Sequence, residues 1–432
     1  MKTKAVRLHG ENDLRLEELD LPPLKDDEIL ARVISDSICM SSYKATVQGA
    51  RHKRVPNDVA THPIVIGHET AGEIVEVGAK WRDKFAPGDR FGLQPAIDHP
   101  AILNGLGAPG YSYEYMGGAA TYVNIPKEVM EQDCLLPYDG PAFYLASLAE
   151  PMSTIVGTFH AMYHTEKFKC EHHMGILEGG KLAILAGAGP MGLGAVDYAI
   201  HGDRKPGLIV VTDIDGDRLA RAERLIPPAE AEQHGVTLHY VNTGGDDPGE
   251  AARRTGDPVG HLKELTNGHG FDDVLVFAPV PALFEQADRI LAYDGCLNFF
   301  AGPTDPTMSA KLNIYDVHYS SHHVMGTSGG GTEDMKEALD LMSSGRINPS
   351  AMITHIGGLD AAAQTTQNLP SIPGGKKLIY PGIAMELTAI EEFAQKGREA
   401  PLFAELARIT EGHAGLWSPE AERFLLENAP AI

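Results

Sequence analysis

Apolar residues in the first 150 positions occur in short runs rich in β-branched side chains, separated by turns that contain glycine and proline. Examples are EILARVIS at 28–35, AGEIVEVG at 71–78 and GDRFGLQP at 88–95. Short runs at this spacing are typical of strands, and several in succession favour a barrel or sandwich. We therefore expect a β-rich, barrel-like domain at the start of the chain.

The apolar pattern lengthens after Glu150-Pro151. The segment STIVGTFHAMYHTE at 153–166 has apolar residues at helical spacing, with Ser153 as the expected N-cap. After an insert at 166–180, apolar strands alternate with helices. The strands are expected at 181–189, 207–213, 238–243, 272–278 and 296–302, and the helices at 190–202 and 215–226. This βαβ repeat predicts a doubly wound parallel sheet of the Rossmann type. The charged, glycine-rich stretch 243–270 is expected to be a helix with solvated loops.

The last third of the chain returns to shorter elements. We expect a helix at 332–347, strands at 352–359 and 374–380, and three amphipathic helices at 387–400, 401–412 and 418–429. Ser418 and Pro419 form a clear helix start, as N-cap and first helical residue. The three tail helices are expected to cap the core surface, and a subunit contact is the alternative.

The expected architecture is therefore α/β with two domains, as a length of 432 residues favours. A β-rich catalytic domain is formed by 1–156 and completed by 334–432. A Rossmann domain at 157–333 is inserted into it, and 383–432 is a helical C-terminal extension.

The charge and composition indicate which kinds of binding partner and which cellular compartment to expect. A formal net charge of −23 argues against nucleic acid and anionic membranes, and no apolar run is long enough to cross a bilayer. The first residues, MKTKAVRLHGEND, lack the apolar stretch of a signal peptide. The four cysteines are widely scattered, which favours a reducing cytoplasm over a disulfide framework. They are Cys39, Cys134, Cys170 and Cys296.

A dinucleotide fingerprint follows the first strand of the expected Rossmann domain. Gly187, Gly189 and Gly192, with Pro190 and Met191 between them, match G-x-G-x-x-G. The first glycine permits a tight turn, the second lets the backbone approach a pyrophosphate, and the third allows close packing of helix on strand. The following helix directs its free N–H groups toward the phosphates. A βα turn without a cofactor is the weaker alternative.

Asp213 ends the next strand at the distance that this fingerprint requires. Its carboxylate can accept hydrogen bonds from the ribose hydroxyls of NAD and would repel a 2′-phosphate. We therefore expect NAD(H), and Arg218 nearby leaves NADP(H) possible.

A set of metal-ligand side chains lies upstream of this fingerprint. Cys39, His68 and Glu69 supply a thiolate, an imidazole and a carboxylate, the three groups that bind Zn²⁺ well. Each alone could be a structural residue, but a metal site followed by a nicotinamide site implies hydride transfer at a zinc-activated oxygen. The cluster Cys170-Glu171-His172-His173 also looks metal-binding, yet other ligands are absent from its sequence vicinity. A solvated loop is the favoured interpretation there.

In these segments the sequence resembles the zinc-dependent medium-chain dehydrogenase/reductases, especially the polyol (sorbitol) dehydrogenase branch. The first domain of that family is a GroES-like barrel. The matching segments are DSICMSSYK, VIGHETAGEIVEVG, ASLAEPMSTIVG, GAGPMG, VMGTSGG and ITHIGGL. Further segments, among them MEQDCLLPYDG and DGCLNFFAGP, are similar to ketose-phosphate reductases of this branch.

The resemblance implies roles for single residues. Cys39 and His68 are then zinc ligands, and Glu69 stands where polyol dehydrogenases use a glutamate ligand. Glu150 stands where they have another acid, bound directly or through water. Two carboxylates bound together with the thiolate would make the site anionic, so we expect them not to bind tightly at once. Ser41 matches the hydroxyl that passes a proton between the zinc-bound oxygen and solvent.

Two departures from the family change the expected site. Ser42 replaces a usual aspartate, so the support of the metal ligands is expected to differ. The stretch 94–118, where many relatives hold a second zinc with four cysteines, contains no cysteine. We therefore expect one catalytic zinc and no structural zinc.

The loop between the first two ligands is basic in an otherwise acidic chain. Lys44, Arg51, Lys53 and Arg54 could bind a substrate phosphate, although a solvated charge run is the simpler explanation from residues alone. With the resemblance, a ketose phosphate is the expected substrate, in the first place L-sorbose 1-phosphate reduced to D-glucitol 6-phosphate. Neutral polyols or secondary alcohols are the alternative.

Two other protein classes are alternative interpretations of this sequence. They are a zinc-free reductase of the same superfamily, which would lack the three ligands, and a non-catalytic protein that senses NAD. As an enzyme, the chain is expected to be a cytoplasmic homo-oligomer, a dimer or tetramer.

Overall fold

The chain divides into two compact units. In a computed structural model, residues 1–169, 171–244 and 257–432 are described. Unit 1 comprises Met1–Ser153, Gly331–Gly345 and Ile353–Ile432, and unit 2 comprises Thr154–Gly330 and Arg346–Met352. Among the described residues, no helix is long and apolar enough to cross a membrane.

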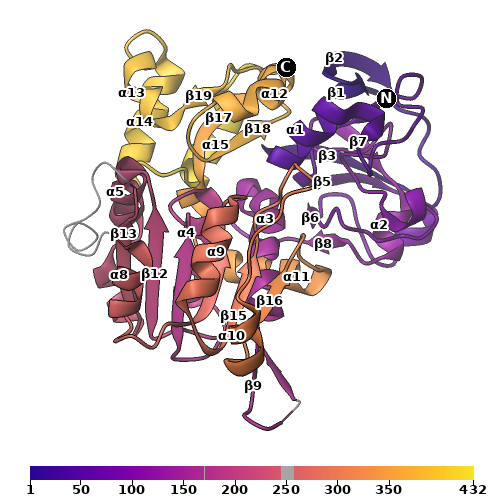
Figure 1. The fold of residues 1–432 in the computed structure, drawn as a ribbon. Coiled ribbons are helices and arrows are strands. Elements are labelled where there is room, and N and C mark those ends of the chain that lie inside the picture. Colours follow the sequence, from indigo (N-terminus) through magenta and orange to yellow (C-terminus); the bar gives the residue numbers. More distant parts are fainter. Residues whose placement is uncertain (170, 245–256) are drawn as a thin grey trace. The chain divides into compact units, whose positions relative to one another are not determined.

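Unit 1 is built on two sheets (Figure 1). The smaller has the order β2-β1-β4, and the larger has the order β19-β17-β18-β3-β5-β6-β8 with β7 paired to β3. Most neighbours are antiparallel, and β17 and β18 are parallel. The bounds are β1 Lys2–Gly10, β2 Asp13–Asp20, β3 Ile29–Ile38, β4 Ile64–Val65, β5 Glu69–Val77, β6 Arg90–Leu93, β7 Tyr122–Ile125, β8 Leu135–Pro137, β17 Ile353–Gly358, β18 Lys376–Tyr380 and β19 Thr388–Ala389.

Apolar side chains of these strands form the core of unit 1. One cluster contains Ile29, Ile74 and Phe91, and a second contains Leu8 and Ile379, all of them fully or almost fully buried. The short apolar runs of the sequence thus became strands, as expected from their pattern.

Helices border the sheets of unit 1. They are α1 Met40–Gln48, α2 Lys127–Glu131, α3 Phe143–Ala161, α11 Thr332–Ser343 and α12 Leu359–Asn368. Of α3, only the residues up to Ser153 belong to unit 1. The expected start of a helix at Ser153 is wrong, because α3 begins ten residues earlier and contains Pro151. Ser153 lies inside the helix and donates its hydroxyl to the carbonyl of Glu150 at 2.6 Å, so it cannot be the N-cap.

The C-terminal extension contains α13 Phe393–Lys396, α14 Pro401–Gly412 and α15 Pro419–Asn428. The expected start of the last helix is confirmed, since the Ser418 hydroxyl accepts from the N–H of Ala421 at 3.2 Å. The first expected helix is much shorter than its sequence pattern, because Thr388–Ala389 forms β19 and pairs with β17.

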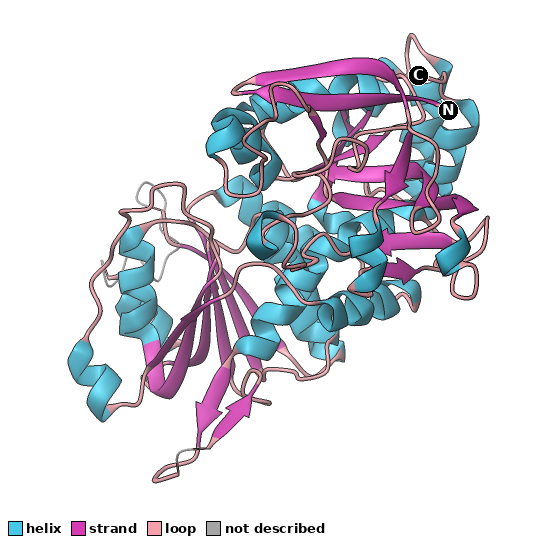
Figure 2. Ribbon diagram, turned by 90° about the vertical axis from the view of Figure 1, so that its right-hand side faces the viewer, coloured by secondary structure: helices cyan, strands magenta, loops and turns pink. Residues whose placement is uncertain are grey.

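Unit 2 has a six-stranded parallel sheet of order β13-β12-β11-β14-β15-β16, with helices on both sides (Figure 2). This confirms the expected α/β class with a Rossmann-type sheet. The strands are β11 Lys181–Leu185, β12 Leu208–Asp213, β13 Thr237–Asn242, β14 Phe271–Val276, β15 Leu291–Phe299 and β16 His323–Gly326. The helices are α4 Pro190–His201, α5 Gly216–Leu225, α6 Pro228–Gln233, α8 Pro258–Glu264, α9 Pro281–Ile290 and α10 Ile314–Tyr319. Of the stretch 243–270, residues 245–256 lie outside the described part.

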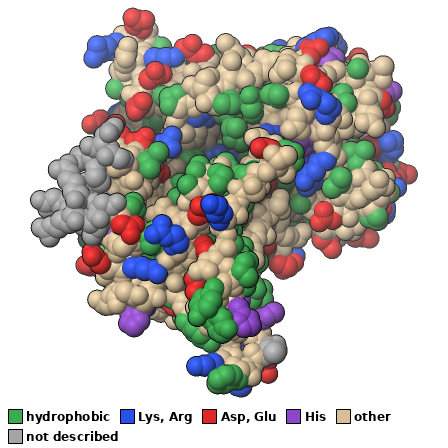
Figure 3. All heavy atoms as spheres, viewed as in Figure 1, with side chains coloured by type: hydrophobic (Ala, Val, Ile, Leu, Met, Phe, Trp, Pro, Cys, Tyr) green, Lys and Arg blue, Asp and Glu red, His purple; other side chains and the backbone are tan. Residues whose placement is uncertain are grey.

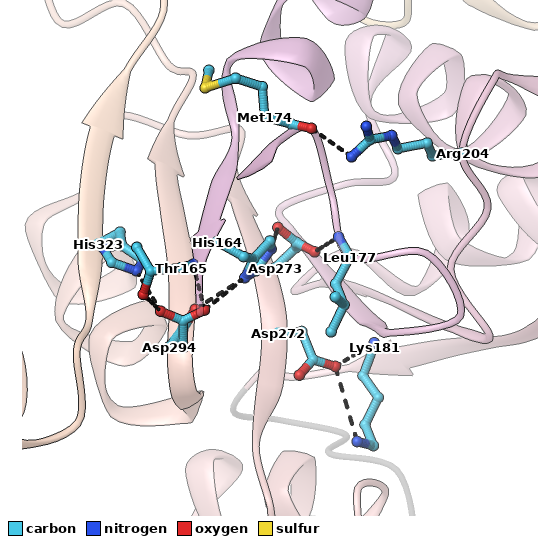
Figure 4. A network of polar contacts seen from close by, with 10 residues as sticks. All are labelled: His164, Thr165, Met174, Leu177, Lys181, Arg204, Asp272, Asp273, Asp294 and His323. Carbon is cyan, nitrogen blue, oxygen red and sulfur yellow. Dashed lines mark hydrogen bonds and ion pairs between the residues drawn. The ribbon is translucent and has the colours of Figure 1, made fainter. Parts of the chain in front are cut away.

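The segment before β11 forms a hairpin of β9 (Tyr163–Thr165) and β10 (His172–Met174), of which β10 lies in the insert at 166–180. Polar contacts join it to the sheet (Figure 4). His164 contacts Asp273 on β14 at 3.0 Å, and Asp294 on β15 accepts from the N–H of Thr165 at 2.8 Å. The expected helix at 153–166 is therefore wrong at its end. Cys170 of the possible metal cluster lies outside the described residues, and His172 and His173 are exposed on β10.

Candidate active site

The three expected zinc ligands lie together in unit 1. Cys39 follows the end of β3, and His68 and Glu69 stand at the start of β5, which pairs with β3 so that Ser37 lies opposite Glu69. One donor atom from each of Cys39, His68 and Glu69 lies within 4.8 Å of the other two. A thiolate, an imidazole and a carboxylate at this separation suit Zn²⁺.

Glycine is required immediately before these ligands. Gly67 has a φ of +92°, and a Cβ there would lie 2.5 Å from Oδ2 of Asp36 and 2.7 Å from the backbone nitrogen of Ala119. The backbone therefore turns tightly enough to bring His68 next to the end of β3 only because residue 67 has no side chain.

Hydroxyl groups surround both ring nitrogens of His68. The Ser42 hydroxyl lies 3.2 Å from Nδ1, while Ser41 lies 3.2 Å and Tyr111 3.3 Å from Nε2. Burial lowers the pKa of His68, so the ring is neutral at neutral pH. With Ser42 accepting from the Nδ1 hydrogen, Nε2 keeps its lone pair for a metal. The serine in place of the family's aspartate can thus still orient the ligand.

A lysine from far along the chain contacts Glu69. Lys376 on β18 donates a short hydrogen bond to Oε1 of Glu69, and Ser37 on β3 donates one to Oε2. The side chains of Lys376 and Glu69 are both buried. Burial raises the pKa of Glu69 to about 7, and the Lys376 ammonium opposes that shift. Sequence reasoning missed Lys376, because nothing in GGKKLIY distinguishes it from Lys377.

Glu150 lies on α3, within electrostatic range of the ligands but outside the group that meets within 4.8 Å among the described residues. Burial raises the pKa of Glu150, a protonated His68 would oppose this rise, and the negative charge of Glu69 adds to it. Its carboxyl group is thus near the site without being a direct member of the ligand group.

Tyr111 is a second residue that sequence reasoning missed. It comes from the cysteine-free stretch 94–118, and its ring packs against His68 at 4.8 Å and stacks on His52 at 5.7 Å between ring centroids. Burial and the charge of Cys39 raise the pKa of its phenol, which therefore remains a hydrogen-bond donor at neutral pH. Three tyrosines alternate in this stretch, so the pattern alone could not select one of them.

The cations of the basic loop differ in whether their charge affects the histidines of the candidate site. Arg54 is half-buried, donates to the carbonyl of Leu106 at 2.9 Å, and its charge lowers the pKa of His68. Burial lowers the pKa of His52 to about 4, with contributions from Arg54, Lys53 and Lys44. Arg51 is exposed and forms an ion pair with Glu11 at 2.8 Å.

The expected nucleotide loop in unit 2 connects β11 to α4. Gly189 is the N-cap and Pro190 the first residue of the helix, followed by Met191. A Cβ at Gly192 would lie 2.1 Å from the carbonyl oxygen of Gly187, so helix and loop approach too closely for a side chain. A Cβ at Gly189 would meet nothing within 4 Å, which leaves its backbone open to a ligand. These features fit a pyrophosphate at the helix start.

Asp213 ends β12 beside this loop and is buried. Its carboxylate accepts from the N–H of Ala188 at 3.3 Å and from the N–H of Ile214 at 2.8 Å. Arg218 on α5 pairs with Asp215 at 3.4 Å. Two carboxylates therefore stand at the end of β12, and the nearby arginine is engaged with one of them.

Comparison with known proteins agrees with both units. Residues 25–133 match the alcohol dehydrogenase GroES-like domain, and residues 190–344 match the zinc-binding dehydrogenase domain. The chain is 53% identical over 426 residues to mannitol-1-phosphate 5-dehydrogenase of Aliivibrio fischeri, covering 99% of this chain and 98% of that protein. It is 48% identical over 430 residues to L-sorbose 1-phosphate reductase of Klebsiella pneumoniae, covering 100% and 98%.

The fold agrees with solved dehydrogenases. The structure of 2R,3R-butanediol dehydrogenase from Bacillus subtilis superposes with a TM-score of 0.66 at 22% identity, covering 88% of this chain and 99% of that one. The family matches and the two full-length relatives confirm the resemblance recognised in the sequence. The chain belongs to the zinc-dependent medium-chain dehydrogenase/reductases, in the branch of polyol and sugar-phosphate dehydrogenases.

Proposed function

We propose that this chain transfers hydride between a nicotinamide cofactor and a ketose phosphate or the corresponding polyol phosphate. The observation that carries the proposal is the position of Arg54 in a strongly acidic chain. The Arg54 carbonyl accepts from the hydroxyl of Ser112 at 2.7 Å, and the adjacent residue, Tyr111, lies 3.3 Å from Nε2 of His68. Both relatives described above are named for sugar 1-phosphates. Reduction of L-sorbose 1-phosphate to D-glucitol 6-phosphate is the first reaction to test, and mannitol 1-phosphate is the second substrate.

The metal-binding residues in this proposal are Cys39, His68 and Glu69, with Glu150 as an outer acid. Zinc bound there would polarise the substrate oxygen and stabilise the negative charge that develops on it during reduction. The Lys376 ammonium neutralises Glu69 when that carboxylate is not a ligand. One zinc per chain and no structural zinc remain our expectation.

Ser41 is the proposed proton carrier. Its hydroxyl lies 3.2 Å from Nε2 of His68, a proposed zinc ligand, and this distance supports a role in proton transfer to the substrate oxygen. A hydroxyl at this distance can donate to an alkoxide and recover a proton from solvent. The Tyr111 hydroxyl, 3.3 Å from the same nitrogen, would orient that oxygen by donating a hydrogen bond.

The loop Gly187–Gly192 is the proposed site of the cofactor pyrophosphate, with NAD(H) as the preferred cofactor. Asp213 and Asp215 would both repel a 2′-phosphate. Because Arg218 is paired with Asp215, NADP(H) would bind only after that ion pair opens.

Arg54, His52 and Lys44 form the proposed phosphate subsite. Arginine offers a planar pair of donors for a phosphate, and the hydrogen bond to Leu106 holds the Arg54 side chain in place. Arg51 is the least suitable of the loop's cations, because Glu11 already neutralises it.

A substrate panel tests the proposal. The purified chain, after metal analysis, is assayed with NADH and NADPH against phosphorylated and free ketoses. About one zinc per chain and a much higher kcat/KM for a ketose phosphate are expected. Preference for free ketoses would favour a neutral-polyol dehydrogenase, and NADH binding without turnover of any substrate would favour a non-catalytic sensor.

We also propose a cytoplasmic location. Cys39, Cys134 and Cys296 are free thiols in the described part of the chain, and a catalytic thiolate ligand is best preserved under reducing conditions.

A further inference from the structure

The first turn of α3 is bound by a carboxylate from the C-terminal extension. The N–H groups of Phe143 and Tyr144 donate to the two oxygens of Glu422 on α15, at 2.6 and 2.8 Å. The first N–H groups of a helix have no partner within the helix, and a negative charge is favourable at this end. Glu422 thus supplies from a distant segment what a neighbouring N-cap residue usually supplies.

The same carboxylate binds the end of β18. The Tyr380 hydroxyl donates to Glu422 at 2.9 Å, and the indole N–H of Trp417 donates to the Tyr380 oxygen at 2.8 Å. Because an indole nitrogen can only donate, the hydrogen of Tyr380 is directed to Glu422. All three side chains are buried, so water does not compete for these bonds.

Both elements that Glu422 joins carry side chains of the candidate active site. Glu150 lies seven residues after Phe143, which is about two turns along α3. Lys376 lies four residues before Tyr380, so both project from the same face of β18. A further hydrogen bond, between Ser147 on α3 and Ser35 on β3 at 2.9 Å, connects the helix to the strand that precedes Cys39.

We propose that Glu422 is a positioning residue for the active site: it fixes the start of α3 to the end of β18 and so aligns Glu150 and Lys376 around His68 and Glu69. The C-terminal extension is then part of the catalytic apparatus rather than a surface cap. This inference rests on the proposed function, since Glu150 and Lys376 matter for chemistry only if a metal is bound by Cys39, His68 and Glu69.

The test replaces Glu422 by glutamine, which keeps the volume and removes the charge. In Glu422→Gln, one side-chain oxygen becomes an NH2 group. This group cannot accept a hydrogen bond from the N–H of Phe143 or Tyr144 or from the Tyr380 hydroxyl, so at least one of these bonds is lost. We expect kcat to fall about tenfold or more and zinc affinity, measured by competition with a chelator, to weaken about tenfold. The Kd for NADH, measured by fluorescence, should stay within twofold, because the nucleotide loop belongs to unit 2.

Ser418→Ala is the matched control. It removes the N-cap of the same helix, the hydrogen bond to Ala421, without touching the carboxylate. It should lower the Tm while leaving kcat and zinc affinity unchanged. If Ser418→Ala weakens zinc binding and kcat as much as Glu422→Gln does, Glu422 acts only through the stability of α15 and the proposal is overturned.

Tyr380→Phe provides an independent variant, which decides the question if Glu422→Gln does not fold. It removes only the hydroxyl that joins β18 to the carboxylate, and it should weaken zinc binding in the same direction. Zinc affinity and kcat within twofold of the wild type in the variants that fold would overturn the proposal. The zinc measurement needs no substrate, so it separates failure of this inference from failure of the proposed substrate class.

Discussion

At the scale of residues, the ion pair of Glu69 and Lys376 should make stability depend on zinc. In Lys376→Met, the buried carboxylate loses its cation, and we expect the metal-free chain to lose about 3 kcal/mol of unfolding free energy. Zinc supplies a replacement positive charge, so the loss should be much smaller in the zinc-loaded protein. Denaturant unfolding with and without zinc measures the difference.

The adjacent lysine is the control for this prediction. Lys377 donates to the carbonyls of Pro373 at 2.9 Å and Gly375 at 2.7 Å, away from the ligand group. Lys377→Met should destabilise the chain equally in the presence and absence of zinc. An equal loss for Lys376→Met under both conditions would contradict the proposed exchange of cations at Glu69.

Arg54 and Arg51 offer a second comparison between residues of one loop. Arg54→Ala should raise KM for a phosphorylated ketose about tenfold, the effect of losing one hydrogen bond to a charged group. Arg51→Ala removes the same charge three residues away, yet KM should change less than twofold because Glu11 already pairs with it. The KM values are measured by steady-state kinetics with phosphorylated and free ketoses. Equal increases of KM in the two variants would contradict a phosphate contact specific to Arg54.

Residues of the candidate site were predictable from the sequence only where neighbours along the chain identify them. Cys39, His68 and Glu69 occur in short segments whose composition indicates a metal site. Lys376 lies 307 residues after Glu69 and reaches it because β18 pairs with β3. Hydrophobic periodicity does not specify which strands pair, so such a contact is beyond sequence reasoning.

At the scale of elements, the β9–β10 hairpin should be held by a charged histidine. His164 directs Nε2 to a carboxylate oxygen of Asp273 and Nδ1 to the carbonyl of Asp294, each at 3.0 Å. Both partners accept, so both ring nitrogens carry hydrogen when Asp273 is ionised. Burial opposes this charge, but the Asp273 hydrogen bond raises the pKa of His164 overall.

This network predicts a pH dependence of stability. Because the folded pKa of His164 lies above its usual value of 6.5, its contribution is complete below pH 6.5 and is lost as pH rises through the raised value. Asp273, Asp294 and, through Asp294, His323 are the titratable groups that face it (Figure 4). Tm measured across this window should fall less steeply in His164→Gln than in the wild type.

The exposed histidine His62, paired with Glu114, is the control for that experiment. His62→Gln should leave the slope of Tm against pH unchanged. If His164→Gln keeps the wild-type slope as well, His164 is not charged in the folded chain.

Element types were largely predictable, and the errors have identifiable causes. The strands of the Rossmann sheet and the start of α15 follow from local patterns. The predicted start of this helix at Ser153 lies ten residues after the start of α3, because a proline usually marks a helix boundary, whereas here the helix continues through Pro151. The partner that satisfies the first N–H groups of α3 is Glu422, which lies far outside any local window.

At the scale of the whole molecule, the sequence predicted the α/β class because two different periodicities occupy separate stretches of the chain. It also predicted that two late strands belong with the first domain; in the structure β17 and β18 lie in the same sheet as β3 and β5. What the pattern could not specify was the strand order, since an apolar run shows that a segment is a strand but not which strand it pairs with. The strand order depends on pairing between distant segments. The loop-closure entropy and the contact energy of that pairing cannot be read from a local stretch of sequence.

The remaining prediction concerns assembly, which we expect to be a dimer or tetramer. Unit 2 exposes apolar side chains on α10, where Ile314, Tyr315 and Tyr319 are each more than half exposed (Figure 3). Among the described strands, β16 has only β15 as a neighbour, so its outer edge is unpaired. Covering three such side chains contributes about 1.5–3 kcal/mol for each one fully buried, which favours association.

Light scattering coupled to size exclusion should therefore give at least twice the 46.4 kDa of one chain. The double substitution Tyr315→Glu and Tyr319→Glu should shift the mass toward a single chain, because association would then bury two unpaired charges. Leu16→Glu, at an exposed position on β2 of unit 1, is the control and should leave the mass unchanged. An oligomer that survives the double substitution would place the subunit contact on a different surface from α10, and a wild-type mass of one chain would refute assembly altogether.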